Sequence, residues 1–166
     1  MRKYLLLFIL YLFVFLISII SNNTIITTTK EYMYPTNYTD ISSNYGNRIL
    51  YGSHNFHNGV DFLAPEGSEI YATNSGYVEY ASFLESGYGN TIIIAHNSNI
   101  KSLYCHTSEN YIVKVGDFVN KGEVIGYVGP KYLSNGILNG NTTGPHLHFS
   151  IFENETTIDP FTLLKK

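Results

Sequence analysis

Six histidines occur in the chain, and two of them form the pattern His146-Leu147-His148. This pattern lies in an apolar run, residues 145–151, whose composition is typical of a β-strand. Side chains of a strand alternate between its two faces, so both imidazoles should point to the same face. Two imidazoles on one face of an apolar strand indicate a shared role, such as a metal site or a catalytic pair.

A second pair of candidate groups, His57 and Asp61, lies four residues apart. That spacing places both side chains on one face of a strand or of a helix, and Gly59 between them disfavours the helix. Two imidazoles and one carboxylate make a three-ligand set that suits zinc and leaves one tetrahedral position open for water.

Cys105, the only cysteine, is a conceivable fourth ligand, which a structural zinc site would require. Its neighbours are Tyr104 and His106. If this segment is a strand, Cys105 faces opposite to both of them. We therefore interpret Cys105 as a small core residue. A single cysteine also excludes an internal disulfide.

The chain after residue 40 consists of short apolar runs separated by Gly, Asn, Ser and Pro. Each run is about five residues long and rich in β-branched or aromatic residues, which predicts strands. No stretch after Asn22 shows a sustained 3.6-residue apolar period. We therefore predict a mainly β domain built from antiparallel sheets. The runs are residues 59–63, 77–81, 91–95, 111–115, 124–128 and 147–151.

The N-terminal segment has a different character, because seventeen uncharged residues, 4–20, follow Arg2 and Lys3. A helix of this length reaches about 26 Å, the short end of a bilayer span. An uncleaved membrane anchor and a cleaved signal peptide both remain open, and both place the rest of the chain outside the cytoplasm. We expect a hydrophobic helix over residues 1–20, a polar tether over 21–40 and one domain over 41–163.

The net charge of the chain limits the kinds of partner that it can bind. Without Arg2 and Lys3, eight basic residues (10 − 2) stand against thirteen acidic ones, a net charge of −5. Binding to nucleic acid requires clustered Lys and Arg that neutralise phosphates. We therefore expect no nucleic-acid partner.

Three segments, taken together and in order, resemble the signatures of the lysostaphin/LytM-type zinc metallopeptidases, a family of peptidoglycan endopeptidases. They are Phe56-His-Asn-Gly-Val-Asp61, Tyr104-Cys-His106 and Gly144-Pro-His-Leu-His-Phe149. Residues 67–72, 76–78, 87–90 and 115–126 are also similar to that family. The resemblance covers residues 44–160. It implies a compact antiparallel-sheet domain, like a duplicated hybrid motif, that cuts cross-linking or bridge peptides of peptidoglycan.

The resemblance also implies roles for particular residues. His57, Asp61 and His148 would bind one zinc ion per domain. His106 and His146 would flank the metal and act in acid–base and transition-state roles. Tyr51, six residues before His57, is a candidate for transition-state support.

The implied chemistry is hydrolysis of a peptide bond. Zinc lowers the pKa of a bound water and polarises the scissile carbonyl. One of the two remaining histidines would accept the water proton, and the other would stabilise the oxyanion or protonate the leaving amine. The sequence leaves open which does which. It also leaves two alternatives, a non-catalytic regulator of this type and a sheet-based carrier module, although Lys121 lies in a turn pattern rather than at a carrier's hairpin tip.

Other positions carry smaller expectations. Arg48 should form an anchoring ion pair, His96 should be structural, and His54 should lie on the surface. The family often has Glu at the position of Ser150, so we expect a loosened supporting contact there. The long loop at residues 130–143 should shape the substrate groove.

Overall fold

A computed structural model describes residues 32–165, so the helix expected over residues 1–20 and residues 21–31 of the expected tether lie outside the described part. Within that part, no helix is long and apolar enough to cross a membrane. The described residues form β1 (Ile41–Ser43), β2 (Gly46–Leu50), β3 (Ser53–His57), β4 (Val60–Phe62), β5 (Glu69–Tyr71), β6 (Gly76–Leu84), β7 (Gly89–Ala95), β8 (Ile100–Cys105), β9 (Phe118–Val119), β10 (Val124–Tyr127), β11 (Leu147–Glu153), β12 (Thr156–Ile158) and a 3₁₀ helix, η1 (Pro160–Thr162).

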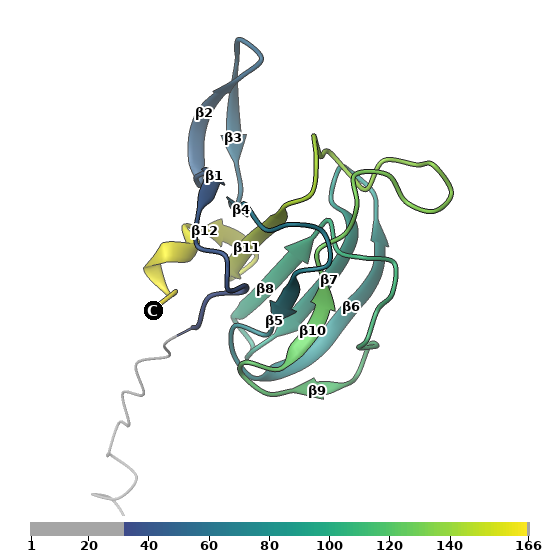
Figure 1. Cartoon of the computed structure of the whole chain (residues 1–166). Helices are drawn as coiled ribbons and strands as arrows, with labels where there is room; N and C mark the ends of the chain where they lie inside the picture. Colours follow the sequence, from purple (N-terminus) through teal and green to yellow (C-terminus); the bar gives the residue numbers. More distant parts are fainter. Residues whose placement is uncertain (1–31, 166) are drawn as a thin grey trace, which may run out of the picture. The chain divides into compact units, whose positions relative to one another are not determined.

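One eight-stranded sheet forms the body of the domain (Figure 1). Its strands lie in the order β1-β4-β11-β8-β7-β6-β9, and β12 pairs with β11. Two smaller pairs, β5 with β10 and β2 with β3, complete the fold. Every pair of named strands is antiparallel. The prediction of a mainly β, antiparallel domain is confirmed for the described residues.

Strand β11, which lies between β4 and β8, alternates apolar and polar residues over its first five positions, as its sequence predicts. Leu147, Phe149 and Ile151 are fully buried, and they alternate with His148 and Ser150. Antiparallel partners in register share a face, so the apolar set continues across the neighbouring strands as a single layer. The histidine of β11 therefore lies on the opposite face of the sheet from the core.

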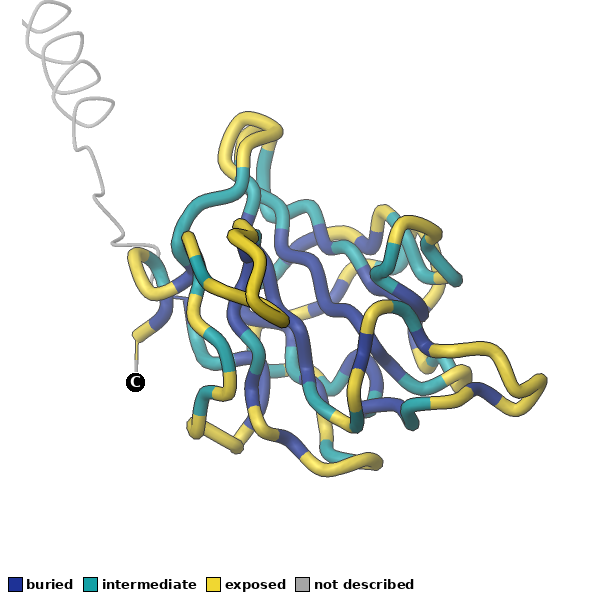
Figure 2. The backbone as a smooth tube through the Cα atoms, turned by 90° about the horizontal axis from the view of Figure 1, so that it is seen from above, coloured by how far each residue is buried: buried dark blue, intermediate teal, exposed yellow. Residues whose placement is uncertain are grey.

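The core lies between the apolar face of the large sheet and the β5–β10 pair. Ile70 of β5 and Ile125 of β10 are fully buried in one cluster with Ile92, Ile94 and Phe149. Figure 1 shows β5 and β10 in front of β6, β7 and β8, and Figure 2 shows buried backbone through the middle of the domain. Fully burying one such side chain contributes roughly 1.5–3 kcal/mol, so this cluster fixes the sheet that carries the polar face.

The described residues before β1, 32–40, lie in the segment expected to be a polar tether, and some of their side chains pack on the domain. Tyr32 is 1% exposed and belongs to the core cluster, and it forms a parallel bridge with Leu164. The amide of Met33 donates to the carbonyl of Thr73 at 2.9 Å. Residues 32–36 therefore pack on the domain, because Tyr32 and Tyr34 find apolar partners that the local sequence does not reveal, whereas residues 37–40 are exposed.

One of the six predicted strands is absent. Residues 111–115 form no strand, and Ile112 and Val115 are 49% and 62% exposed. Val113 belongs to the core cluster, and Tyr111 packs against that cluster. The segment belongs to the connection between β8 and β9, so these two residues anchor a loop instead of a strand.

Candidate metal centre

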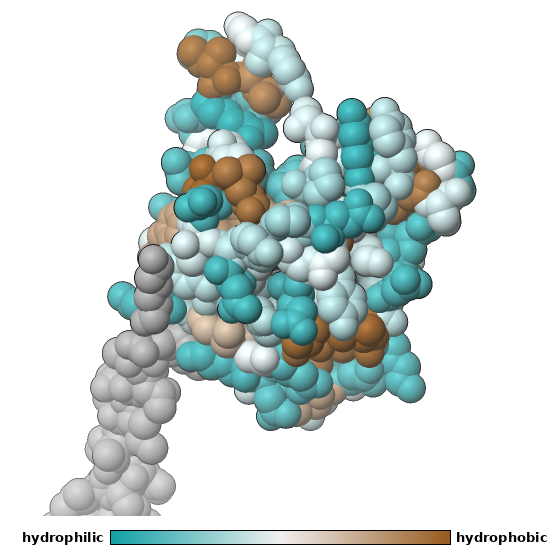
Figure 3. All heavy atoms as spheres, in the orientation of Figure 1, coloured by the Kyte–Doolittle hydropathy of each residue, from teal (hydrophilic) through white to brown (hydrophobic). Residues whose placement is uncertain are grey.

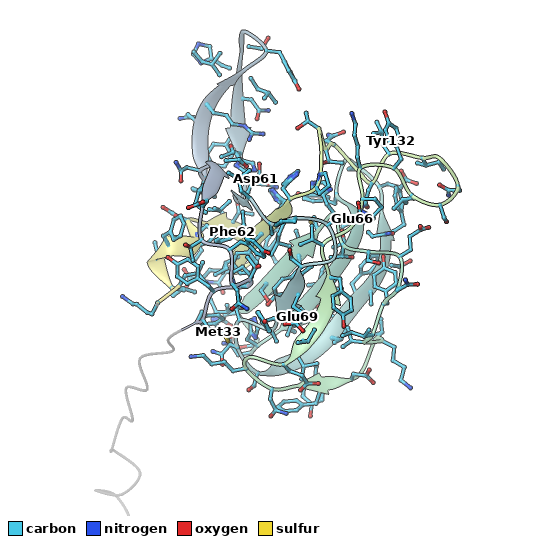
Figure 4. The ribbon with its side chains drawn as sticks, viewed as in Figure 1. Met33, Asp61, Phe62, Glu66, Glu69 and Tyr132 are labelled. Carbon is cyan, nitrogen blue, oxygen red and sulfur yellow. The ribbon has the colours of Figure 1, made fainter. Side chains whose placement is uncertain are left out.

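Three side chains from three strands meet on the polar face of the sheet. His57 ends β3, Asp61 lies in β4, and His148 lies in β11 directly opposite Asp61 in the strand register. Nδ1 of His148 is 2.8 Å from Oδ1 of Asp61 and 3.0 Å from Nε2 of His57. Nε2 of His57 is 3.2 Å from the same carboxylate oxygen. Asp61 is labelled in Figure 4, where the β2–β3 hairpin meets the sheet.

These three donor atoms form a triangle of the size that zinc requires. Zinc at about 2.0–2.2 Å from nitrogen and oxygen ligands in a tetrahedron holds those ligands roughly 3.3 Å apart. All three atoms here lie within 4.8 Å of one another, and no other group of this kind occurs among the described residues. A His₂–carboxylate set with the fourth position unfilled by protein fits catalytic zinc. Cys105 is not part of the set.

Hydrogen bonds fix which nitrogen of each ligand histidine faces the centre. Nδ1 of His57 lies 2.9 Å from the carbonyl of Asn44, which can only accept, so Nδ1 carries the proton and Nε2 faces the site. Nε2 of His148 contacts the hydroxyl of Ser150 at 3.0 Å, which leaves its Nδ1 for the centre. Ser150 therefore contacts this histidine at the position where the family often has Glu.

The third residue of this candidate set, Asp61, is held as a carboxylate. Burial raises its pKa, but hydrogen bonds and charges from His148 and His57 outweigh burial, and the pKa ends well below its usual range. Nη1 of Arg48 lies 3.7 Å from the other oxygen, Oδ2. The anchoring ion pair expected for Arg48 is confirmed, and it leaves Oδ1 facing the two imidazoles.

Close packing behind the ligands requires glycine at position 59. A Cβ atom there would lie 2.5 Å from the carbonyl oxygen of Phe149 and 2.8 Å from Cε1 of His148. Gly59 thus lets β4 approach β11 closely enough for Asp61 and His148 to meet.

His106 comes to the same face by leaving the strand geometry. It follows β8 with a positive φ of 60°, an uncommon conformation for a residue other than glycine. Strict alternation would have placed it on the core side with Tyr104, whereas Cys105 pairs in register with His148 and so shares the polar face. The predicted orientation of Cys105 relative to His106 is therefore wrong, although Cys105 is fully buried as expected.

The imidazole of His106 is buried, neutral and oriented. Its Nδ1 lies 2.6 Å from the carbonyl of Asn139, so Nδ1 carries the proton and Nε2 is the accepting nitrogen. Burial, helped by the charges of His146 and His148, lowers the pKa of His106 to about 3. Its ring centroid is 4.7 Å from that of His146 and 6.1 Å from that of His148.

His146 lies beside the ligand set without belonging to it. Its Nδ1 is 2.9 Å from the carbonyl of Gly144, and its Nε2 is 3.7 Å from Oδ1 of Asp61. Like His106, it turns Nε2 toward the centre. The structure thus brings together all five side chains that the sequence singled out as metal ligands or catalytic histidines.

An open pocket of about 400 Å³ surrounds these groups. Its walls include residues that the sequence did not single out, notably Tyr88 and Asn58, whose side-chain amide donates to the Tyr88 hydroxyl at 2.6 Å. Asn141 also lines it, so the loop at residues 130–143 does shape the pocket. The only signal for Tyr88 was its place in the family-like segment at residues 87–90.

Four other candidates lie elsewhere. Tyr51 is at the tip of the β2–β3 hairpin, 85% exposed and outside the pocket lining, and Figure 3 shows hydrophobic atoms at that projecting end. His54 is exposed, as expected. His96 bonds the carbonyl of Ser75 and the hydroxyl of Ser102, which confirms a structural role. Lys121 is exposed in a turn.

Comparison with known proteins identifies the family of the chain. Residues 55–160 match Peptidase family M23, and the chain belongs to that family. It is 33% identical over 131 residues to the DD-carboxypeptidase/endopeptidase Mpg of Neisseria meningitidis, covering 78% of this chain and 28% of Mpg. It is 38% identical over 114 residues to lysostaphin of Staphylococcus simulans, covering 66% of this chain and 21% of lysostaphin. The chain thus spans less than a third of the length of these relatives.

Solved structures show the same fold. The lysostaphin catalytic domain from Staphylococcus simulans aligns with a TM-score of 0.63 and 34% identity, over 76% of this chain and 91% of that domain. A zinc-containing peptidase from Vibrio cholerae aligns with a TM-score of 0.63 and 30% identity, over 78% of this chain and 38% of that one. The fold is therefore that of a lysostaphin-like M23 peptidase.

Proposed function

We propose that this protein is a zinc endopeptidase that hydrolyses cross-linking or bridge peptides of bacterial peptidoglycan outside the cytoplasm. Membership of the M23 family and the similarity to peptidoglycan endopeptidases support the reaction class. In this proposal, His57, Asp61 and His148 hold one zinc ion, and His106 and His146 are the catalytic histidines.

The chemistry divides between the metal and the chain. Zinc, when bound, polarises the scissile carbonyl and lowers the pKa of a water molecule. His106 is kept neutral by burial, and the Asn139 carbonyl fixes its tautomer, so its Nε2 accepts a proton. His146, whose Nδ1 proton is held by the Gly144 carbonyl, donates from Nε2 only in its imidazolium form, and in that form it would stabilise the oxyanion or protonate the leaving amine.

The observation that carries the proposal is the pair of imidazoles that are not ligands. A structural zinc site does not require two further imidazoles. Placing two such rings beside the candidate metal ligands costs free energy, because their polar atoms lose contact with water. Both rings instead turn Nε2 toward the centre and anchor Nδ1 on backbone carbonyls. That arrangement suits proton transfer at a position beside the metal.

The test uses the full-length chain supplied with zinc and incubated with purified peptidoglycan. Newly released amino groups would be counted for the wild type, for His106→Ala and for His54→Ala, a control histidine outside the pocket. We expect His106→Ala to lower the rate by about 10²–10⁴-fold and His54→Ala to leave it unchanged. Wild-type release no greater than that of His106→Ala would reject the enzyme and favour a non-catalytic regulator.

A further inference from the structure

A second open pocket lies on the same face of the large sheet, next to the metal centre. It has a volume of about 330 Å³, and Ile93, Leu103 and Phe152 are among its lining residues. Tyr88 lines both this pocket and the one around the metal ligands, so the two are adjacent. Nothing in the mechanism above uses this second pocket.

The strand register gives its distance from the reaction centre. Leu103 lies opposite Ser150, which is two residues along β11 from the ligand His148. Two residues of a strand span about 7 Å. An extended peptide advances about 3.3–3.6 Å per residue, so a peptide lying along β11 would place the side chain two residues from its scissile bond over this pocket.

The pocket combines an apolar floor with an acidic rim. Ile93 and Leu103 are partners in register on β7 and β8, and Phe152 is opposite Lys101 on β11 and β8. At the rim, Nζ of Lys101 is 3.1 Å from Glu79 and 3.2 Å from Glu155. Two carboxylates against one ammonium leave a net charge of −1 on this rim.

We infer that this pocket is a specificity subsite for a substrate residue with an unbranched alkyl side chain that ends in an ammonium group. The methylene groups would lie on Ile93, Leu103 and Phe152, and the ammonium would reach the unbalanced carboxylates of Glu79 and Glu155. Diamino acids of this kind are the cross-linking residues of peptidoglycan stem peptides. The inference rests on the proposed function and names the part of its substrate that is recognised.

Binding, rather than hydrolysis, tests the subsite. The zinc-loaded full-length chain would be titrated with the stem tetrapeptide L-Ala–γ-D-Glu–L-Lys–D-Ala and with the same peptide carrying norleucine in place of Lys. We expect the Lys peptide to bind about fivefold more tightly, the effect of an exposed ion pair worth up to about 1 kcal/mol. The amide resonances of Ile93 and Leu103 should shift with both peptides.

Substitutions test separately what the acidic rim and the apolar floor of the pocket contribute to binding. Glu79→Gln combined with Glu155→Gln should remove the preference for the Lys peptide, and Phe152→Ser should weaken both peptides. Glu153→Gln is the matched control, because Glu153 is exposed and lies on the other face of the same strand. Equal binding of both peptides, no measurable binding, or a preference that survives the double replacement would each overturn the subsite.

The outcome is separable from that of the proposed function. Peptide binding with the stated preference but no release of amines from peptidoglycan would reject the endopeptidase and keep the subsite. Hydrolysis of peptidoglycan without a preference for the Lys peptide would reject the subsite alone.

Discussion

At the scale of single residues, the site depends on the hydrogen-bond partners that hold the histidines as much as on the histidines themselves. Each of the four imidazoles has one ring nitrogen bonded away from the centre, by carbonyls of Asn44, Asn139 and Gly144 or by the Ser150 hydroxyl. Partners of this kind fix the tautomer and the ring orientation of metal ligands. Removing one of these partners should therefore lower the affinity of the site for the metal.

Ser150→Ala should weaken zinc binding, because Nε2 of His148 would lose its hydrogen bond to the Ser150 hydroxyl. Loss of such an outer partner typically costs about 10–100-fold in metal affinity. Competition with a chromophoric chelator would measure the dissociation constant. Ser82→Ala, an exposed position on β6, should leave it unchanged. An unaltered constant for Ser150→Ala would show that this hydroxyl does not support His148.

Cys105 should be protected from thiol reagents in the folded protein. Burial raises the pKa of its thiol well above the usual range, so the folded state binds that proton more tightly than the unfolded state does. Stability is therefore unaffected below the unfolded thiol pKa of about 8.5 and falls as pH rises above it. Labelling at pH 8 should be slower than in denaturant by about 10³-fold or more. Labelling at the same rate in both conditions would contradict a buried thiol.

At the scale of elements, the hydrogen bonds of Asn139 attach the loop at residues 130–143 to the rest of the domain. The side chain of Asn139 is fully buried, accepts from the amide of Asn90 at 2.8 Å, and donates to the carbonyls of Thr107 at 3.0 Å and Pro130 at 3.2 Å. The backbone carbonyl of the same residue holds His106. This loop therefore both lines the pocket and orients the imidazole of His106, which we propose to be catalytic.

Asn139→Ala should lower both the free energy of unfolding and the catalytic rate. Each buried polar group left without its partner costs about 1–3 kcal/mol, and a displaced carbonyl would free the His106 ring. Urea unfolding and the release of amines from peptidoglycan would measure the two effects. Asn135→Ala, at an exposed position in the same loop, should change neither by much. A destabilised Asn139→Ala variant with an unchanged rate per folded molecule would separate the loop from His106.

At the scale of the whole molecule, core residues lie on both sides of the range 41–163 expected for the domain. Tyr32 and Leu164 both belong to the core cluster. The ring of Tyr32 packs edge-on against His96, with centroids 5.1 Å apart. We propose that residues 32–40 fold as part of the domain.

Tyr32→Ala should therefore destabilise the protein strongly. Truncating a buried aromatic side chain costs about 3–5 kcal/mol, and urea unfolding would measure it. Tyr38→Ala, at a residue that is 44% exposed, is the control and should cost well under 1 kcal/mol. Equal midpoints for the two variants would show that residue 32 contributes little to the core.

Much of the fold could be predicted because alternation of apolar and polar residues is local information. It predicted five of six strands correctly, including the one that carries His148. It failed at residues 111–115, where burial of Val113 is decided by packing rather than by alternation. It also failed at His106, where a single positive φ reverses the side chain's direction.

The sequence by itself determined the chemistry, since the types and order of five side chains indicate a zinc site with two further histidines. Only the tertiary structure decided how they meet, because β4, β11 and β8 are neighbours in the sheet although they lie far apart in the chain. β4 carries Asp61, β11 carries His148, and His106 directly follows β8. The tertiary structure also leaves Tyr51 exposed at a hairpin tip and places Tyr88 in the pocket lining. The physical reason is that the type of a side chain determines whether it can bind a metal or transfer a proton. The pairing of the strands determines which side chains lie close enough to act together.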